Sequence, residues 1–98
     1  MKHFLLSFLL LLLGVAGLHA QERVVTGKVL SAEDNSPLPG VNIVVKGTTT
    51  GAISDIEGNF ALSVSGNGST LVFSYIGFIT KEVEIGTQST FDVMLEPD

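Results

Sequence analysis

The sequence contains no cysteine, and its two histidines, His3 and His19, both lie within the first 20 residues. The absence of cysteine excludes disulfide bonds, a cysteine nucleophile and a lipid-modified amino-terminal cysteine. Without a later histidine, the rest of the chain lacks the usual base for a serine nucleophile and the commonest zinc ligand. The Asp and Glu side chains fall in turns or at outward-facing strand positions, where solvation explains them. We therefore expect no enzyme activity, no catalytic residue and no cofactor.

Basic side chains are also scarce. The chain has 5 Lys and Arg residues against 10 Asp and Glu residues, a formal net charge of −5. Removal of an amino-terminal leader would take Lys2 with it and leave 4 basic residues against 10 acidic ones, a net charge of −6. Because phosphate binding needs clustered Lys and Arg, we expect no nucleic-acid partner.

Residues 1–20 have the three-part plan of a secretory signal peptide. Lys2 and His3 give a positive start, residues 4–13 are almost entirely Leu and Phe, and residues 14–20 are smaller. A transmembrane anchor is the competing interpretation, but the apolar run is shorter than the roughly 20 residues that a spanning helix needs. We predict cleavage after Ala20, which leaves one domain over residues 21–98.

Residues 51–60 separate two apolar runs and have the composition of a turn. Asp55 and Asn59 can bond their side chains to nearby backbone amides, and Gly58 tolerates a positive φ. Phe60 then starts an alternating run and is expected to be its first buried residue. We interpret the stretch as a structural hairpin turn.

A calcium loop is the alternative interpretation of the same turn, because Asp55, Glu57 and Asn59 alternate as oxygen ligands do. Calcium takes about 6 to 8 oxygen ligands, and the dense Asp spacing and terminal Glu of an EF-hand are missing. We therefore assign no metal ligand.

The remainder has the pattern of about seven short strands separated by turn signals, which is typical of an all-β sandwich. Alternation places Ile53 and Ile79 inward, and Gly27 marks a bulge or a close backbone approach. Leu38, held between two prolines, is expected to plug one end of the core. The Asn67-Gly68 pair predicts a hairpin that joins residues 60–64 to residues 70–75. The predicted strands cover residues 24–30, 41–46, 48–54, 60–64, 70–75, 79–85 and 91–96.

Four large side chains surround Gly77: Tyr75, Ile76, Phe78 and Ile79. Alternating apolar residues in a small β-domain usually belong to the core, which is one interpretation of this cluster. The other is an exposed patch that docks a protein partner. The Thr-rich residues 48–50 offer a second contact, as an edge that accepts an added strand.

Several short motifs follow one another in a characteristic order: Val25-Thr-Gly-Lys-Val29, Pro37-Leu-Pro-Gly-Val41, Val45-Lys-Gly-Thr48, Gly51, Ser54-Asp55, Gly58-Asn-Phe60 and Phe73-Ser-Tyr-Ile-Gly-Phe78. Together they resemble the carboxypeptidase-regulatory-like domain, and the resemblance covers residues 24–96. It implies a transthyretin-like (prealbumin-like) β-sandwich. The family name implies no peptidase activity here, because the metal ligands of a zinc hydrolase are missing.

Behind a signal peptide, this domain resembles the amino-terminal extension of SusC/RagA-type TonB-dependent outer-membrane receptors of Bacteroidota. In that family a TonB-contacting segment, a plug and a β-barrel come next, and the barrel imports glycans, peptides or siderophores. The resemblance implies a fragment of such a receptor, an accessory domain on the periplasmic face of the outer membrane. Its partners would be its own plug and barrel or the periplasmic energising machinery, with membrane association only through the barrel. The alternative is a stand-alone secreted or surface module that binds a protein or glycan as an adhesin or scaffold.

Overall fold

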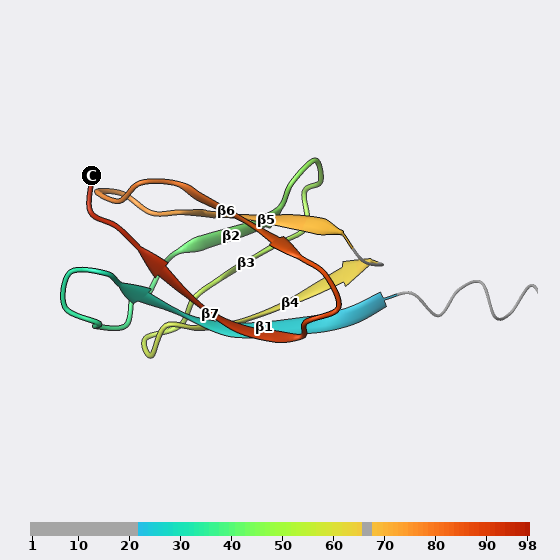
Figure 1. Ribbon diagram of the computed structural model, residues 1–98, viewed down its shortest axis with the longest axis horizontal. Helices are drawn as coiled ribbons and strands as arrows, with labels where there is room; N and C mark the ends of the chain where they lie inside the picture. The colour runs from blue at the N-terminus through green and yellow to red at the C-terminus, as the bar shows by residue number, and fades with distance from the viewer. Residues whose placement is uncertain (1–21, 66–67) are drawn as a thin grey trace, which may run out of the picture.

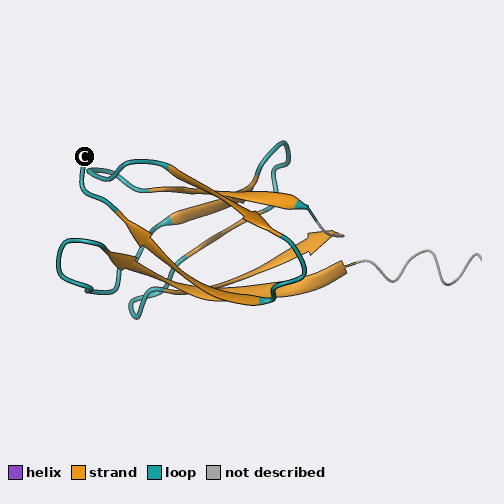
Figure 2. Cartoon of the chain, viewed as in Figure 1, coloured by secondary structure: helices purple, strands orange, loops and turns teal. Residues whose placement is uncertain are grey.

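Strands, turns and loops make up the whole of residues 22–65 and 68–98, the part of the chain that the computed structural model describes (Figure 1, Figure 2). No helix occurs in these two ranges, and so none that is long and apolar enough to cross a membrane. The expected signal peptide, residues 1–20, lies outside the described residues, as do Gly66 and Asn67 of the expected hairpin. The strands are β1 (Glu22–Ser31), β2 (Asn42–Val45), β3 (Gly51–Ile53), β4 (Asn59–Ser65), β5 (Ser69–Ser74), β6 (Lys81–Ile85) and β7 (Thr90–Leu95).

The seven strands form two sheets that face each other (Figure 1). One sheet has the order β4-β1-β7, and the other has the order β3-β2-β5-β6. β1 pairs in parallel with β7, whereas every other pair is antiparallel. The prediction of a seven-stranded all-β sandwich is therefore confirmed.

The core lies between the sheets and follows from the alternation along each strand. In β4 every second residue is buried, and Phe60 at its start is only 5% exposed. The Phe60 ring meets Phe73 of the facing sheet edge to face, with ring centroids 5.5 Å apart. The buried apolar residues form one cluster: Val25, Val29, Leu38, Val41, Ile43, Val45, Phe60, Leu62, Val64, Leu71, Phe73, Ile85, Val93 and Leu95.

Gly27, in the middle of β1, has neighbouring groups closer to its backbone than the other glycines of the described residues have. A Cβ atom there would lie 2.0 Å from the Phe91 carbonyl oxygen and 2.8 Å from Phe60 Cζ. The β1–β4 ladder continues through the Gly27–Phe60 pair without interruption. Of the two expectations for Gly27, the close backbone approach is confirmed.

Leu38 is 8% exposed and belongs to the core, as the proline corner predicts. Its amide donates to the Val29 carbonyl at 3.0 Å, and its carbonyl accepts from the Ser54 hydroxyl at 2.6 Å. Ser54 Oγ also accepts the Val41 amide at 2.9 Å, so this buried hydroxyl joins the proline corner to the end of β3.

The predicted pairing of residues 60–64 with residues 70–75 is wrong. β4 pairs with β1, whereas β5 pairs with β2 and β6, so the two strands lie in different sheets. Each strand has one apolar face, and the two faces meet across the interior instead of lying side by side in one sheet. Residues 54–58 likewise connect β3 in one sheet with β4 in the other, so this stretch is a turn between sheets and not a hairpin.

Two inward assignments are also wrong. Ile53 is 66% exposed, because in the short strand β3 the alternation places Ala52 against the core. Ile79 is 52% exposed, because β6 begins only at Lys81 and Ile79 lies in the loop before it. The Ile79 error comes from extending strand alternation beyond the residues that form the ladder. Ile53 does lie in the ladder, opposite Asn42, but on its outward face.

Phe60→Ala is expected to lower the free energy of unfolding by about 3 to 5 kcal/mol, because it leaves a cavity between the two sheets. Urea unfolding followed by circular dichroism measures the change. Ile53→Ala is the control, and because its side chain is exposed its effect should stay within about 0.5 kcal/mol. Equal effects of the two variants would contradict the burial of Phe60.

Gly27→Ala is expected to destabilise the domain by about 3 kcal/mol or more, because the backbone carbonyl of Phe91 would have to move away from the new Cβ. This is at or above the upper end of the usual cost of overpacking a core. Gly86→Ala is the matched control, since a Cβ at Gly86 meets no atom within 4 Å. The control should be neutral or stabilising by up to about 1 kcal/mol. Thermal unfolding of the two variants side by side provides the comparison, and an unchanged melting temperature for Gly27→Ala would show that β1 tolerates a side chain there.

Candidate interaction surface

The turn between β3 and β4 is built around the Asp55 carboxylate. Its Oδ1 accepts the amides of Glu57 at 3.0 Å and Asn59 at 2.9 Å. Gly58 has a φ of 81°, and its amide donates to the Asp55 carbonyl at 2.8 Å. A Cβ on Gly58 would approach the Val29 carbonyl to 2.6 Å. The polar residues of this turn thus hold backbone groups in place, and Phe60 comes next, at the start of β4.

The described residues contain no group of three or more His, Cys, Asp or Glu side chains that could hold a metal ion. At the β3–β4 turn, Asp55 Oδ1 is already occupied by two amides. The Asn59 side-chain amide donates to the Glu57 carboxylate at 3.4 Å. These oxygens serve the turn itself.

The four residues Tyr75, Ile76, Phe78 and Ile79, here called the Ile76 corner, divide into an inner and an outer pair. The Tyr75 and Phe78 rings have centroids 5.7 Å apart and pack against the core. Ile76 is 92% exposed and Ile79 is 52% exposed. The Phe78 amide donates to the Tyr75 carbonyl at 3.1 Å, and Gly77 has a φ of 85°, so a tight turn holds Ile76 at its tip. The core interpretation therefore fits the two rings, and the exposed-patch interpretation fits the two isoleucines.

Residues 96–98 run antiparallel to residues 77–79 and border the Ile76 corner. The Ile79 amide donates to the Glu96 carbonyl at 2.9 Å, and the Asp98 amide donates to the Gly77 carbonyl at 2.9 Å. Phe78 and Pro97 form the bridge between these two bonds. The backbone after β7 is thus fixed to the turn that carries Ile76.

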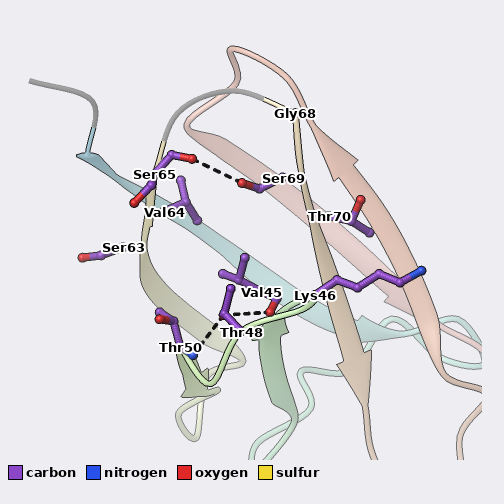
Figure 3. A pocket seen from close by; sticks show the side chains of 10 residues that line it. All are labelled: Val45, Lys46, Thr48, Thr50, Ser63, Val64, Ser65, Gly68, Ser69 and Thr70. Atoms are coloured by element: carbon purple, nitrogen blue, oxygen red, sulfur yellow. Dashed lines mark hydrogen bonds between the residues drawn. The ribbon is translucent and has the colours of Figure 1, made fainter. Parts of the chain in front are cut away.

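A hollow of about 350 Å³ lies at the other end of the sandwich, near the β2–β3 turn (Figure 3). Hydroxyl side chains dominate its lining, and some of them serve the local backbone: Thr48 Oγ1 donates to the Val45 carbonyl at 2.9 Å and accepts the Thr50 amide. Lys46 bonds Glu82 of β6 at 2.8 Å, and this hydrogen bond raises the pKa of the lysine. The lining residues are Val45, Lys46, Thr48, Thr50, Ser63, Val64, Ser65, Gly68, Ser69 and Thr70.

Arg23 is an important residue that reasoning from sequence missed. Its guanidinium donates to the carbonyls of Thr87 at 3.0 Å and Gln88 at 2.6 Å, and also to the Gly86 carbonyl. These bonds join the start of β1 to the turn before β7, more than sixty positions later. A single arginine near a strand end carries no sequence signal for such a contact.

Residues 25–98 match the family model of the CarboxypepD_reg-like domain. The chain is 46% identical over 91 residues to TonB-dependent receptor P3 of Formosa agariphila, an alignment that covers 93% of this chain and 9% of that receptor. It is 38% identical over 104 residues to TonB-dependent receptor SusC of Bacteroides thetaiotaomicron, covering 100% of this chain and 10% of SusC. The chain thus spans about a tenth of the length of the receptors it matches.

Among solved structures, a chain of a type II cohesin–X-dockerin complex from Acetivibrio cellulolyticus has a TM-score of 0.60 and 18% sequence identity. The alignment covers 76% of this chain and 57% of that chain. At this identity the likeness concerns the fold alone, and it agrees with the two-sheet architecture described above.

Asp55→Ala is expected to destabilise the domain by about 1 to 3 kcal/mol, because it leaves the amides of Glu57 and Asn59 without their acceptor. Asp55→Asn keeps an oxygen at the same position and should recover most of the loss. Urea denaturation of both variants measures the difference. If added calcium stabilised the unmodified domain but not Asp55→Asn, the turn would be a metal site and the structural interpretation would be wrong.

Proposed function

This chain belongs to the CarboxypepD_reg-like domain family, and from that membership we propose that it is a non-catalytic accessory domain of a TonB-dependent outer-membrane receptor. The observation that carries the proposal is the 46% identity to a receptor over 93% of this chain. The receptor takes up a nutrient such as a glycan, a peptide or a siderophore. Substrate binding and transport belong to the remaining nine-tenths of such a receptor.

The domain is exported behind a signal peptide over residues 1–20 and works at the periplasmic face of the outer membrane as residues 21–98. A non-catalytic role is supported by the lack of cysteine in the sequence and of histidine after residue 19. It is further supported by the turn at Asp55, where a carboxylate oxygen is occupied by backbone amides. The domain therefore acts through contacts with protein, either its own plug and barrel or the periplasmic energising machinery.

The Ile76 corner supports this mode of action. Two isoleucines stand out from a turn that two aromatic rings anchor to the core, so the contact surface is presented on a rigid base. A fixed surface loses little conformational freedom when a partner covers it.

Fractionation of native cells tests the proposal, with an antibody raised against residues 21–98. We expect a single species about ten times the length of this chain, confined to the outer-membrane fraction, in keeping with the receptor relatives. An inner-membrane protein and a soluble periplasmic protein serve as fractionation controls. A small species in the periplasm or the medium would contradict the receptor and identify a stand-alone binding module.

A further inference from the structure

We propose that the Ile76 corner is the docking site for the first residues of the receptor polypeptide after residue 98. This inference rests on the proposed function, since it requires that a receptor continue after the domain. Its occupant is a tethered segment of the same chain, in an extended conformation and with an apolar side chain directed at the corner.

The course of the backbone places this segment. Hydrogen bonds at 2.9 Å join Ile79 to Glu96 and Asp98 to Gly77, so the chain runs antiparallel to the turn residues and toward the tip that carries Ile76. An extended chain advances about 3.3 Å per residue, so the next few residues pass that tip. The pairing of residues 77–79 with residues 96–98 thus directs the outgoing polypeptide along the corner.

The chemistry of the corner fits an apolar side chain. Ile76 and Ile79 expose 92% and 52% of their surface, although the aromatic residues of the same turn are packed against the core. A hollow of about 260 Å³ lies beside Ile79, and Thr80, Lys81, Met94 and Glu96 complete its lining. The Lys81 ammonium donates to the Met94 carbonyl, 3.3 Å away. An apolar side chain of the outgoing segment would therefore find apolar surface at Ile76 and Ile79.

The size of the corner favours a tethered segment over a separate globular partner. A stable protein–protein interface buries about 800 Å² on each partner, far more than two isoleucines and a small hollow can offer. A short tether, in contrast, raises the effective concentration of its own segment to the millimolar range, so that a weak contact suffices.

The test uses the full-length receptor with any native cysteines replaced, in isolated outer membranes. Because this domain contains no cysteine, Ile76→Cys can be combined with a single cysteine at each of the first six residues after Asp98 in turn. In the control series Val24→Cys replaces Ile76→Cys. The Val24 side chain is also exposed, but it lies at the opposite end of the sandwich. After mild oxidation, a polyethylene-glycol maleimide counts the free thiols of the denatured protein.

Disulfide formation needs Cα atoms within about 7 Å, so a docked segment should lose both thiols at one or two positions of the Ile76→Cys series and at none of the Val24→Cys series. Free thiols at every position, in a receptor that is full-length and located in the outer membrane, would overturn the docking site and leave the receptor assignment intact. A disulfide between two receptor copies would overturn it as well, because the occupant would then be a second copy. If no receptor-sized protein exists, the inference fails together with the proposed function.

A second variant pair measures docking without cysteines. Ile76→Ser should make the segment after residue 98 several-fold more susceptible to limited proteolysis in the intact receptor. Ile56→Ser is the matched control, because Ile56 is 82% exposed on the β3–β4 turn and its loss should leave the cleavage rate unchanged. Equal rates for the two variants would contradict docking at the Ile76 corner.

Discussion

The packing of both sheets depends on the missing side chain at Gly27. β1 is the central strand of its sheet, and at Gly27 the Phe91 carbonyl and the Phe60 ring both occupy the space that a Cβ would take. Because Gly27 has no side chain, the Phe60 ring can lie against β1 in the core, where its centroid is 5.5 Å from that of Phe73 and 6.1 Å from that of Phe91. A domain of this size has little surplus stability, so one aromatic cluster at the middle of the core matters to every strand around it.

The start of β1 and residue 98 lie at opposite ends of the sandwich (Figure 1), and the side chains at these two ends differ in chemistry. At the end where β1 starts, Arg23 binds the carbonyls of the turn before β7, and hydroxyl side chains line a hollow near the β2–β3 turn. At the other end, where residue 98 lies, Ile76 and Ile79 are exposed beside a small hollow. Because β1 and β7 run parallel, the start of β1 and the end of β7 lie at opposite ends of the sandwich. Among the described residues, the end of the sandwich that carries residue 98 thus exposes two isoleucines on one turn.

Strand alternation and turn chemistry predict much of this fold. The seven strands, the close approach at Gly27 and the buried Leu38 all follow from residue type and local pattern. Local pattern does not predict the sheet to which each strand belongs, because an apolar face fits the interior equally well from either sheet. The expected pairing of β4 with β5 is wrong for this reason. At the candidate surface, the sequence identifies the apolar cluster around Gly77 but places Ile79 inside. Ile79 is exposed because it lies in the loop before β6, where its amide bonds Glu96, a contact that alternation does not encode.

The contact between residues 77–79 and 96–98 fixes the course of the backbone after β7. A domain on a flexible linker samples many orientations, so its surface does not fix the position of the next part of the chain. Here the backbone beyond β7 is bonded to a turn that the Tyr75 and Phe78 rings attach to the core. The direction of the outgoing chain is therefore set by the rigid part of the domain.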